Sequence, residues 1–232
     1  MAQHKAINLD QISFENVSFQ IEGLDPVLKS VDLKLPMDQT VIIQSRNPVH
    51  AVNLLEILAG RKVPQSGKVR WTDELESEDA LRAIPFFDFV SSYFESNRPD
   101  PDLIVGKILL KSGAGAEMLN EAIEHFSLQD LLQKKFRVLK YESQKLVLLV
   151  LATLKVPQML VLEDPAVGIS EEVFLNFLDW IQYWQRQGNI RHVFMTNNHP
   201  TAARHFASSS LIVDEGYIYL EQVDTFKKIV HF

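Results

Sequence analysis

The fold is decided by Thr40-Val-Ile-Ile-Gln-Ser-Arg-Asn-Pro-Val-His-Ala-Val-Asn-Leu-Leu-Glu-Ile-Leu-Ala-Gly60. The apolar, β-branched run from Val41 to Gln44 is typical of a strand that is buried on both faces. Val52 to Leu58 has helical spacing, and Gly60 is suited to end that helix because glycine accepts a left-handed backbone. The stretch therefore predicts a buried strand, a turn and a helix.

Strand and helix patterns continue on both sides of this stretch. Before it, two alternating runs predict strands that are joined by a turn around Gly23 and Pro26. After it, the chain is mostly helical from Leu103 to Leu154 and then returns to strand and helix alternation. The expected elements are strands at 12–19, 27–35, 68–71, 159–162 and 192–195, helices at 171–186 and 201–207, and a hairpin of 211–213 with 217–220. This order predicts an α/β fold with a parallel sheet core, an antiparallel β edge and an inserted helical subdomain.

Composition excludes several classes of protein. The chain has 232 residues and a net charge of −7, which argues against a nucleic-acid surface. It has no cysteine, so neither disulfides nor a thiolate metal site is possible. No apolar run reaches the roughly 18–20 residues of a membrane span, and the first residues lack the apolar core of a secretory signal. Any membrane role is therefore expected to come through a partner.

A phosphate-binding loop of the pattern G-x-x-x-x-G-K-[ST] would fall in the turn of the opening stretch. Ser45 and His50 stand at its two glycines, where His50 adds a Cβ and a ring beside the backbone. Ala51 replaces the lysine and supplies no ammonium group, while Val52 replaces the hydroxyl that would bind Mg²⁺. Pro48 removes one backbone N–H donor. The pattern predicts that nucleotide binding and metal binding are both lost.

Two alternatives remain for the side chains of this turn. Arg46 or His50 is either a replacement phosphate contact or, as we favour, a solvated loop side chain. The backbone N–H groups of the turn still need partners. We expect Ser45, Asn47 or His50 to supply them, or the loop to close on itself, and the pocket to be collapsed or filled by side chains.

The order and spacing of several motifs resemble the nucleotide-binding subunit of an ATP-binding cassette (ABC) transporter, over nearly the whole chain. The matching segments are 28–36, 54–60, 64–69, 157–170, 192–197 and 211–218. The resemblance implies a single ABC-type domain over 1–232. Its α/β core would comprise 1–88 and 155–232, and its helical subdomain about 89–154.

The resemblance also assigns catalytic positions, and these depart from the family pattern. The Walker B acids stand in reversed order as Glu163 and Asp164. In one interpretation, Glu163 reaches a metal-bound water and Asp164 acts as the base, with a side chain one methylene shorter than that of Glu. In the other, which we favour, both are acids at a strand end that cap the next turn. The switch histidine is replaced by Asn197, which cannot exchange a proton, although His199 lies two residues on. The resemblance places Ile21, which has no aromatic face, where adenine would stack.

The signature loop of the family, L-S-G-G-Q, corresponds to Leu139-Lys-Tyr-Glu-Ser143. Both glycines are replaced, and Glu142 would bring a carboxylate near phosphate oxygens, which is repulsive. In this family each ATP site combines the phosphate loop of one subunit with the signature of the other. Since this chain lacks both, neither a homodimer nor a pairing with an intact cassette would contain a complete site with this chain in it.

These departures predict a catalytically inactive ABC-type subunit that acts as a structural or regulatory component of a membrane transport complex. Its expected partners are a membrane permease and a second cassette, either itself or another subunit, with no nucleic acid. No cofactor or metal is expected, and the location is cytoplasmic and peripheral to a membrane. One alternative is a divergent ATPase that uses ATP and Mg²⁺ through Glu163 and Asp164. Another is a soluble scaffold without a membrane partner.

An aromatic segment, Phe86 to Phe94, corresponds to the family's contact with the membrane subunit. Phe86 and Phe87 continue a strand pattern, whose alternate side chains face opposite ways. The remaining aromatic residues are beside an acid, as in an interface core with a charged rim. They either bind a partner or pack in the joint between subdomains. The candidate partner-binding residues are Asp88, Phe89, Tyr93 and Phe94.

Overall fold

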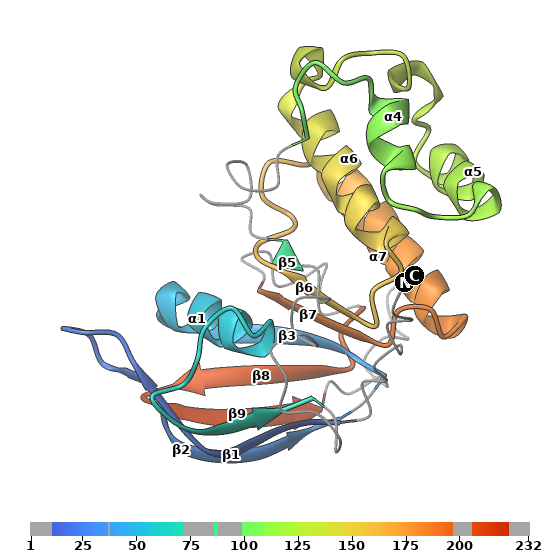
Figure 1. Ribbon diagram of the computed structural model, residues 1–232. Coiled ribbons are helices and arrows are strands. Elements are labelled where there is room, and N and C mark those ends of the chain that lie inside the picture. Colours follow the sequence, from blue (N-terminus) through green and yellow to red (C-terminus); the bar gives the residue numbers. More distant parts are fainter. Residues whose placement is uncertain (1–10, 37, 72–85, 88–98, 197–205, 223–232) are drawn as a thin grey trace, which may run out of the picture.

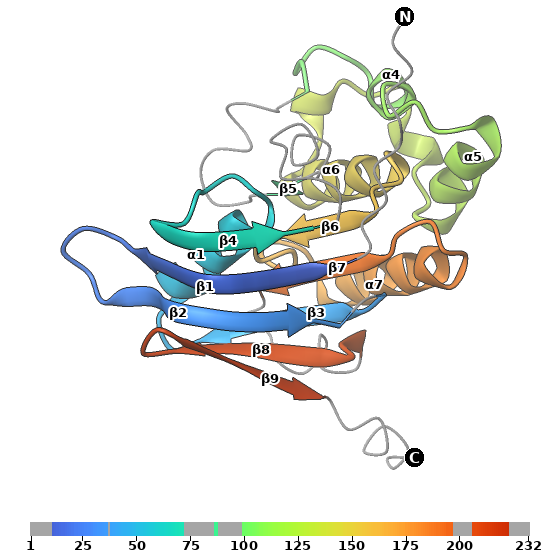
Figure 2. The same ribbon diagram turned by 60° about the horizontal axis from the view of Figure 1, so that its bottom comes forward.

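The structure is a computed structural model that describes residues 11–36, 38–71, 86–87, 99–196 and 206–222. A six-stranded sheet has the order β5-β6-β7-β3-β8-β9, and a three-stranded sheet has the order β2-β1-β4 (Figures 1 and 2). The predicted fold class is confirmed: an α/β core with parallel strands, an antiparallel edge and a separate group of helices.

β3 (Thr40–Ser45) lies in the middle of the six-stranded sheet. It pairs in parallel with β7 (His192–Thr196) on one side and with β8 (Ser209–Asp214) on the other. β6 (Met159–Leu162) continues the parallel sheet beyond β7, and β5 (Phe86–Phe87) pairs with β6. The β-branched run predicted this burial, because helices and the second sheet cover the faces of these strands.

β9 (Tyr217–Gln222) closes the other edge as the antiparallel partner of β8. The three-stranded sheet consists of β1 (Ile12–Gln20), β2 (Pro26–Leu35) and β4 (Ser66–Arg70). β4 approaches β1 closely at Gly67, where a Cβ would lie 2.2 Å from the carbonyl oxygen of Asn16. Only glycine allows this contact, and it also accepts the φ of 80° found there.

α1 (Pro48–Leu58) packs between the two sheets. Leu54 and Leu55 are fully buried, and so are Ile57 and Leu58, in one core that includes side chains of β1, β2 and β3. The helix therefore has apolar contacts on most of its circumference. Apolar spacing predicted its start at Val52, but the helix begins one turn earlier, because Asn47 caps it and Pro48 occupies its first turn.

The helical part consists of α4 (Val105–Leu110), α5 (Ala116–His125), α6 (Tyr141–Leu154) and α7 (Glu171–Arg186), with two 3₁₀ turns, Gln129–Leu131 and Phe136–Val138. α6 contacts the other three helices and shares a second core with β6 and β7 (Figure 1). Among the helices of the described ranges, α7 is the longest at 16 residues, and none has the length and apolar character that a bilayer crossing requires. The predicted helix 201–207 falls mostly outside the described residues, and the division into subdomains stays a prediction.

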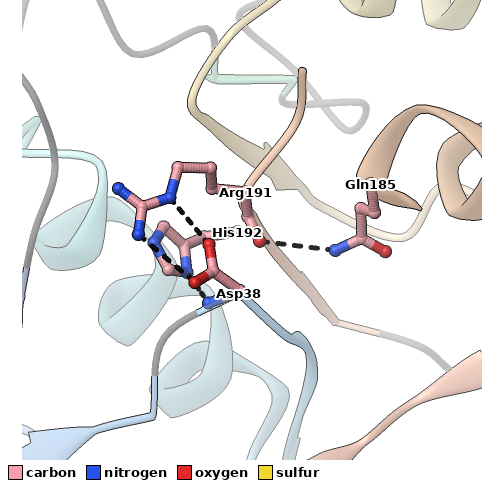
Figure 3. Close-up of polar contacts among 4 residues, drawn as sticks. All are labelled: Asp38, Gln185, Arg191 and His192. Carbon is pink, nitrogen blue, oxygen red and sulfur yellow. Dashed lines mark hydrogen bonds and ion pairs between the residues drawn. The ribbon is translucent and has the colours of Figure 1, made fainter. Parts of the chain in front are cut away.

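A polar cluster ties the turn before β3 to the start of β7 (Figure 3). The guanidinium of Arg191 donates to both carboxylate oxygens of Asp38, at 2.7 and 3.2 Å. The backbone N–H of Asp38 donates to Nδ1 of His192 at 3.1 Å, and the amide of Gln185 donates to the carbonyl of Arg191 at 3.5 Å. Asp38 has a left-handed backbone, with φ of 56°. These bonds fix where β3 enters the sheet relative to β7.

The buried His192 predicts a loss of stability in mild acid. Burial lowers the pKa of His192 from 6.5 to about 4, so the folded chain keeps this ring neutral while the unfolded chain protonates it. The free energy of unfolding should therefore contain the full contribution of neutral His192 above pH 6.5. It should fall by up to ~3 kcal/mol as the pH drops towards 4. Urea unfolding across this window measures the effect. A His192→Asn variant keeps an acceptor for Asp38 and should show a shallower pH dependence; equal slopes would contradict the assignment.

Candidate functional site

The carboxyl ends of the parallel strands meet at one edge of the six-stranded sheet, where ligands of such sheets bind. Ser45 ends β3, Thr196 ends β7 and Asp214 ends β8, while Glu163 directly follows β6. The fold therefore brings together the loop after β3 and the acids after β6, which are the positions that the resemblance assigns to the phosphate loop and to Walker B. This edge is the candidate site.

The loop between β3 and α1 has only two residues, Arg46 and Asn47. The hydroxyl of Ser45 accepts a hydrogen bond from the N–H of Asn47 at 3.2 Å, and the amide oxygen of Asn47 accepts one from the N–H of Val49 at 3.1 Å. The N–H of His50 donates to the carbonyl of Asn47 at 3.0 Å. Ser45 and Asn47 thus occupy N–H groups that a phosphate loop would offer to its ligand, as expected.

His50 lies inside α1 rather than in a loop. Its side chain is 5% exposed, and its Nε2 makes no hydrogen bond to any described residue. The interpretation of His50 as a solvated side chain is therefore wrong, because the early start of α1 turns it into the interior. Ala51 is also buried at the lysine position, whereas Arg46 is exposed, as a solvated loop residue would be.

A cleft of about 330 Å³ remains beside this loop. The expectation of a collapsed or filled pocket is therefore wrong, because the β8–β9 turn and the start of β2 stand apart from the loop. The ionic groups that line the cleft are the carboxylates of Asp25, Asp214 and Glu215 and the cations of Lys29 and Arg46. Acids outnumber cations, which is unfavourable for a triphosphate. Ile21 is partly buried and packs against the core of the two sheets.

The Walker B acids are held by the chain itself. Glu163 is buried, with 6% of its surface exposed. The N–H of Asp164 donates to Oγ1 of Thr196 at 2.9 Å, and that hydroxyl lies 3.4 Å from Oδ1 of Asp164. Among the described residues, no group of three or more His, Asp or Glu side chains could hold a metal ion.

The signature segment contacts the turn that follows the Walker B acids. Oε1 of Glu142 accepts a hydrogen bond from the N–H of Ser170 at 2.7 Å, which lowers the pKa of Glu142. Nζ of Lys145 donates to the carbonyl of Asp164 at 3.0 Å and to that of Val167. Lys145 was not predicted as a functional residue; its signal in the sequence is a lysine directly before the apolar run of α6.

Several predicted site residues lie outside the described residues. These are the switch position Asn197 with its neighbour His199, and the partner-binding candidates Asp88, Phe89, Tyr93 and Phe94. Of the aromatic segment, Phe86 and Phe87 are described and form the predicted strand at the edge of the sheet, paired with β6. The roles of the other residues stay predictions.

Searches against known proteins match the chain to one class. No protein-family model matches it. The zinc import ATP-binding protein ZnuC of Photorhabdus laumondii is 25% identical over 170 residues, which cover 73% of this chain and 62% of ZnuC. The Fe(3+) ions import ATP-binding protein FbpC of Escherichia coli O157:H7 is 23% identical over 210 residues, 84% of this chain and 57% of FbpC. A Bacillus anthracis protein that carries the name ABC transporter ATP-binding protein is 24% identical over 68% of this chain, and the match spans 30% of that protein's length.

Solved structures agree on the fold. A nucleotide-free ATP-binding cassette from an ABC transporter superposes with a TM-score of 0.72, with 16% identity and 94% of each chain covered. The dimeric bacterial cassette MJ0796 gives a TM-score of 0.70, with 18% identity over 92% of this chain and 99% of that one. The chain therefore has the fold of an ABC ATPase cassette. The proteins named above that it resembles in sequence are ATP-binding proteins of transport systems by their names.

The cap of α1 can be tested directly. Asn47→Ala removes the acceptor for the N–H of Val49 and should lower the free energy of unfolding by about 1 kcal/mol. Asn47→Asp keeps an acceptor and should retain most of the stability. Arg46→Ala, at the exposed neighbouring position, is the control and should have little effect. Urea unfolding measures the free energy of unfolding of each variant. Equal values for the Asn47→Ala variant and the native chain would refute the cap.

Proposed function

We propose that this chain is a catalytically inactive ABC-type subunit that serves as a structural or regulatory component of a membrane transport complex. One observation carries the proposal. α1 begins at Pro48, and the N–H groups at its start are bonded to Ser45 and Asn47 instead of being available to a phosphate. A nucleotide would have to break these bonds before it gained any of its own.

The side chains supply no compensation for this loss. Ala51 is buried and carries no charge, and Val52 has no hydroxyl for Mg²⁺. A hydrogen bond to a charged group contributes about 1.5–3 kcal/mol, so the missing lysine alone removes a large share of phosphate affinity. The acidic cleft adds repulsion. We infer that neither ATP nor Mg²⁺ is a working ligand.

A dimer of cassettes that includes this chain would also lack a complete ATP site. A cassette dimer would need this chain to give either a phosphate loop or a signature to each shared site. Glu142 of the signature segment is bonded to the chain's own turn 164–170, and so is Lys145, which follows that segment in α6. We propose a membrane permease and a second cassette, either another copy or a different subunit, as its partners. Its place would be the cytoplasmic face of the membrane, reached through those partners.

Two other functions make different predictions. A divergent ATPase would use Glu163 and Asp164 with ATP and Mg²⁺, and it would bind Mg-ATP. A scaffold without a membrane partner would bind no nucleotide and would not co-purify with a permease. A permease gene beside this one favours the transport complex over the scaffold. A neighbouring gene for an intact cassette would point to a mixed pair of cassettes.

Calorimetry with Mg-ATP tests the proposal. The isolated chain should give no saturable heat at micromolar ATP, because the loop donors are occupied and the lysine is absent. A homologous active cassette is the positive control. Saturable micromolar binding by this chain would overturn the proposal and favour the divergent ATPase.

The partner contact predicts a second result. Phe89→Ala and Tyr93→Ala, in the segment that corresponds to the family's contact with the membrane subunit, should leave the chain folded and abolish co-purification with a permease. Aromatic anchors dominate binding energy at interfaces, so losses of 2 kcal/mol or more (about 30-fold) are expected. Circular dichroism and urea unfolding check the fold. If both variants unfold, these residues belong to the core and the contact assignment is wrong.

A further inference from the structure

We propose that the start of α6 is an internal clamp, made by Glu142 and Lys145, which fixes the helical part of the chain to the sheet without any nucleotide. The inference rests on the proposed function and extends it, because it gives Glu142 of the signature segment and the nearby Lys145 a role in a chain that does not use ATP. The clamp holds the turn 164–170, which connects β6 to α7.

Lys145 is the first element of the clamp. It is fully buried, and its Nζ donates to the carbonyls of Asp164 and Val167, at opposite ends of a tight turn. That turn is closed by the N–H of Val167, which donates to the carbonyl of Asp164 at 3.1 Å. Burial lowers the pKa of Lys145 to about 7, while the nearby Asp164 opposes this shift. A buried amine is unfavourable, so its two bonds must offset a desolvation cost.

Glu142 is the second element, one helical turn earlier in α6. Its carboxylate accepts a hydrogen bond from the N–H of Ser170, which is the residue that caps α7. The ring of Tyr141 fills the space between these two contacts: a Cβ on Gly168 would lie 2.2 Å from its Cε1 atom. One turn of α6 therefore contacts the whole length of the turn 164–170.

The clamp adds directional hydrogen bonds to the apolar packing between two parts of the molecule, at the edge of the sheet opposite to the bonds that Gln185 of α7 makes with Thr40 and Arg191. Asp164 is bonded to Thr196 at the end of β7, so the turn belongs to the sheet. α6 packs on α4, α5 and α7 and carries the helical part (Figure 1). Hydrogen bonds are directional, so they fix an orientation that apolar contacts leave less defined. Since all these bonds lie within the chain, the orientation requires no ligand.

Amide hydrogen exchange of the full chain tests the clamp. In Lys145→Met, the amides of Val167 and Ile169 should exchange at least ~10-fold faster, because hydrogen bonds to a charged donor are lost. In Glu142→Gln, the amide of Ser170 should exchange faster, because a charged acceptor becomes neutral. Lys155→Met, at an exposed lysine just after α6, is the matched control and should match the native chain.

The urea midpoint of each variant distinguishes a local effect on the turn 164–170 from a general loss of packing. Lys145→Met also removes a buried amine, so its midpoint in urea should stay close to that of the native chain while the turn opens. Unchanged exchange of the turn in both clamp variants would overturn the proposal. So would a uniform rise across α6, α7 and the sheet, which would show general unfolding. If Lys145→Met does not fold, Glu142→Gln alone decides by the exchange of Ser170.

An arm with Mg-ATP keeps this result distinct from the proposed function. The native chain should show the same exchange in the turn 164–170 with and without millimolar Mg-ATP. Protection confined to the loop 45–50 would refute the inactive subunit but leave the clamp intact. Added protection of the turn itself by nucleotide would overturn the clamp, because the turn would then need a ligand to become fixed.

Discussion

The rest of the structure depends on the parallel pairing of β3 with β7 and β8. This pairing buries β3 in the sheet and sets the carboxyl ends of the strands side by side. α1 follows β3 in the chain, so the position of β3 also sets the position of the helix between the two sheets. The cluster of Asp38, Arg191 and His192 fixes the same pairing from the opposite edge (Figure 3).

What differs is how the polar groups at the carboxyl edge are used. A phosphate loop keeps donors free for its ligand, at some expense of stability in the empty state. Here the corresponding groups satisfy one another: Asn47 caps α1, Thr196 binds Asp164 and Glu142 binds Ser170. Positions that face a nucleotide in an active cassette are turned into internal contacts. These contacts support the proposal that the fold is retained without nucleotide binding.

Much of the fold could be predicted from the sequence, because local residue patterns determine where its strands and turns form. The β-branched run at 41–44 predicted a buried strand, and the hairpin at 211–220 predicted the antiparallel edge. The start of α1 was missed, although Asn47 and Pro48 are a cap and a first-turn residue, because apolar periodicity begins only later. The burial of His50 follows from that error, since a helix that starts at Pro48 turns this position inward.

Contacts between distant segments could not be predicted in the same way. Glu142 and Ser170 are 28 residues apart, and no local pattern pairs them. Lys145 looked like an ordinary helix residue, because only the packed structure shows the carbonyls that surround its amine. The open cleft was also missed: its walls come from β2, the loop before α1 and the β8–β9 turn, and only the folded chain brings these three segments together.

We propose that the cassette fold persists here without ATP hydrolysis. The most direct measurement is Mg-ATP turnover by the purified assembly of this chain with its membrane partner, compared with an assembly that carries Glu163→Gln and Asp164→Asn. The account predicts no phosphate release above background and no difference between the two assemblies. Turnover that is lost when these two acids are replaced would contradict it.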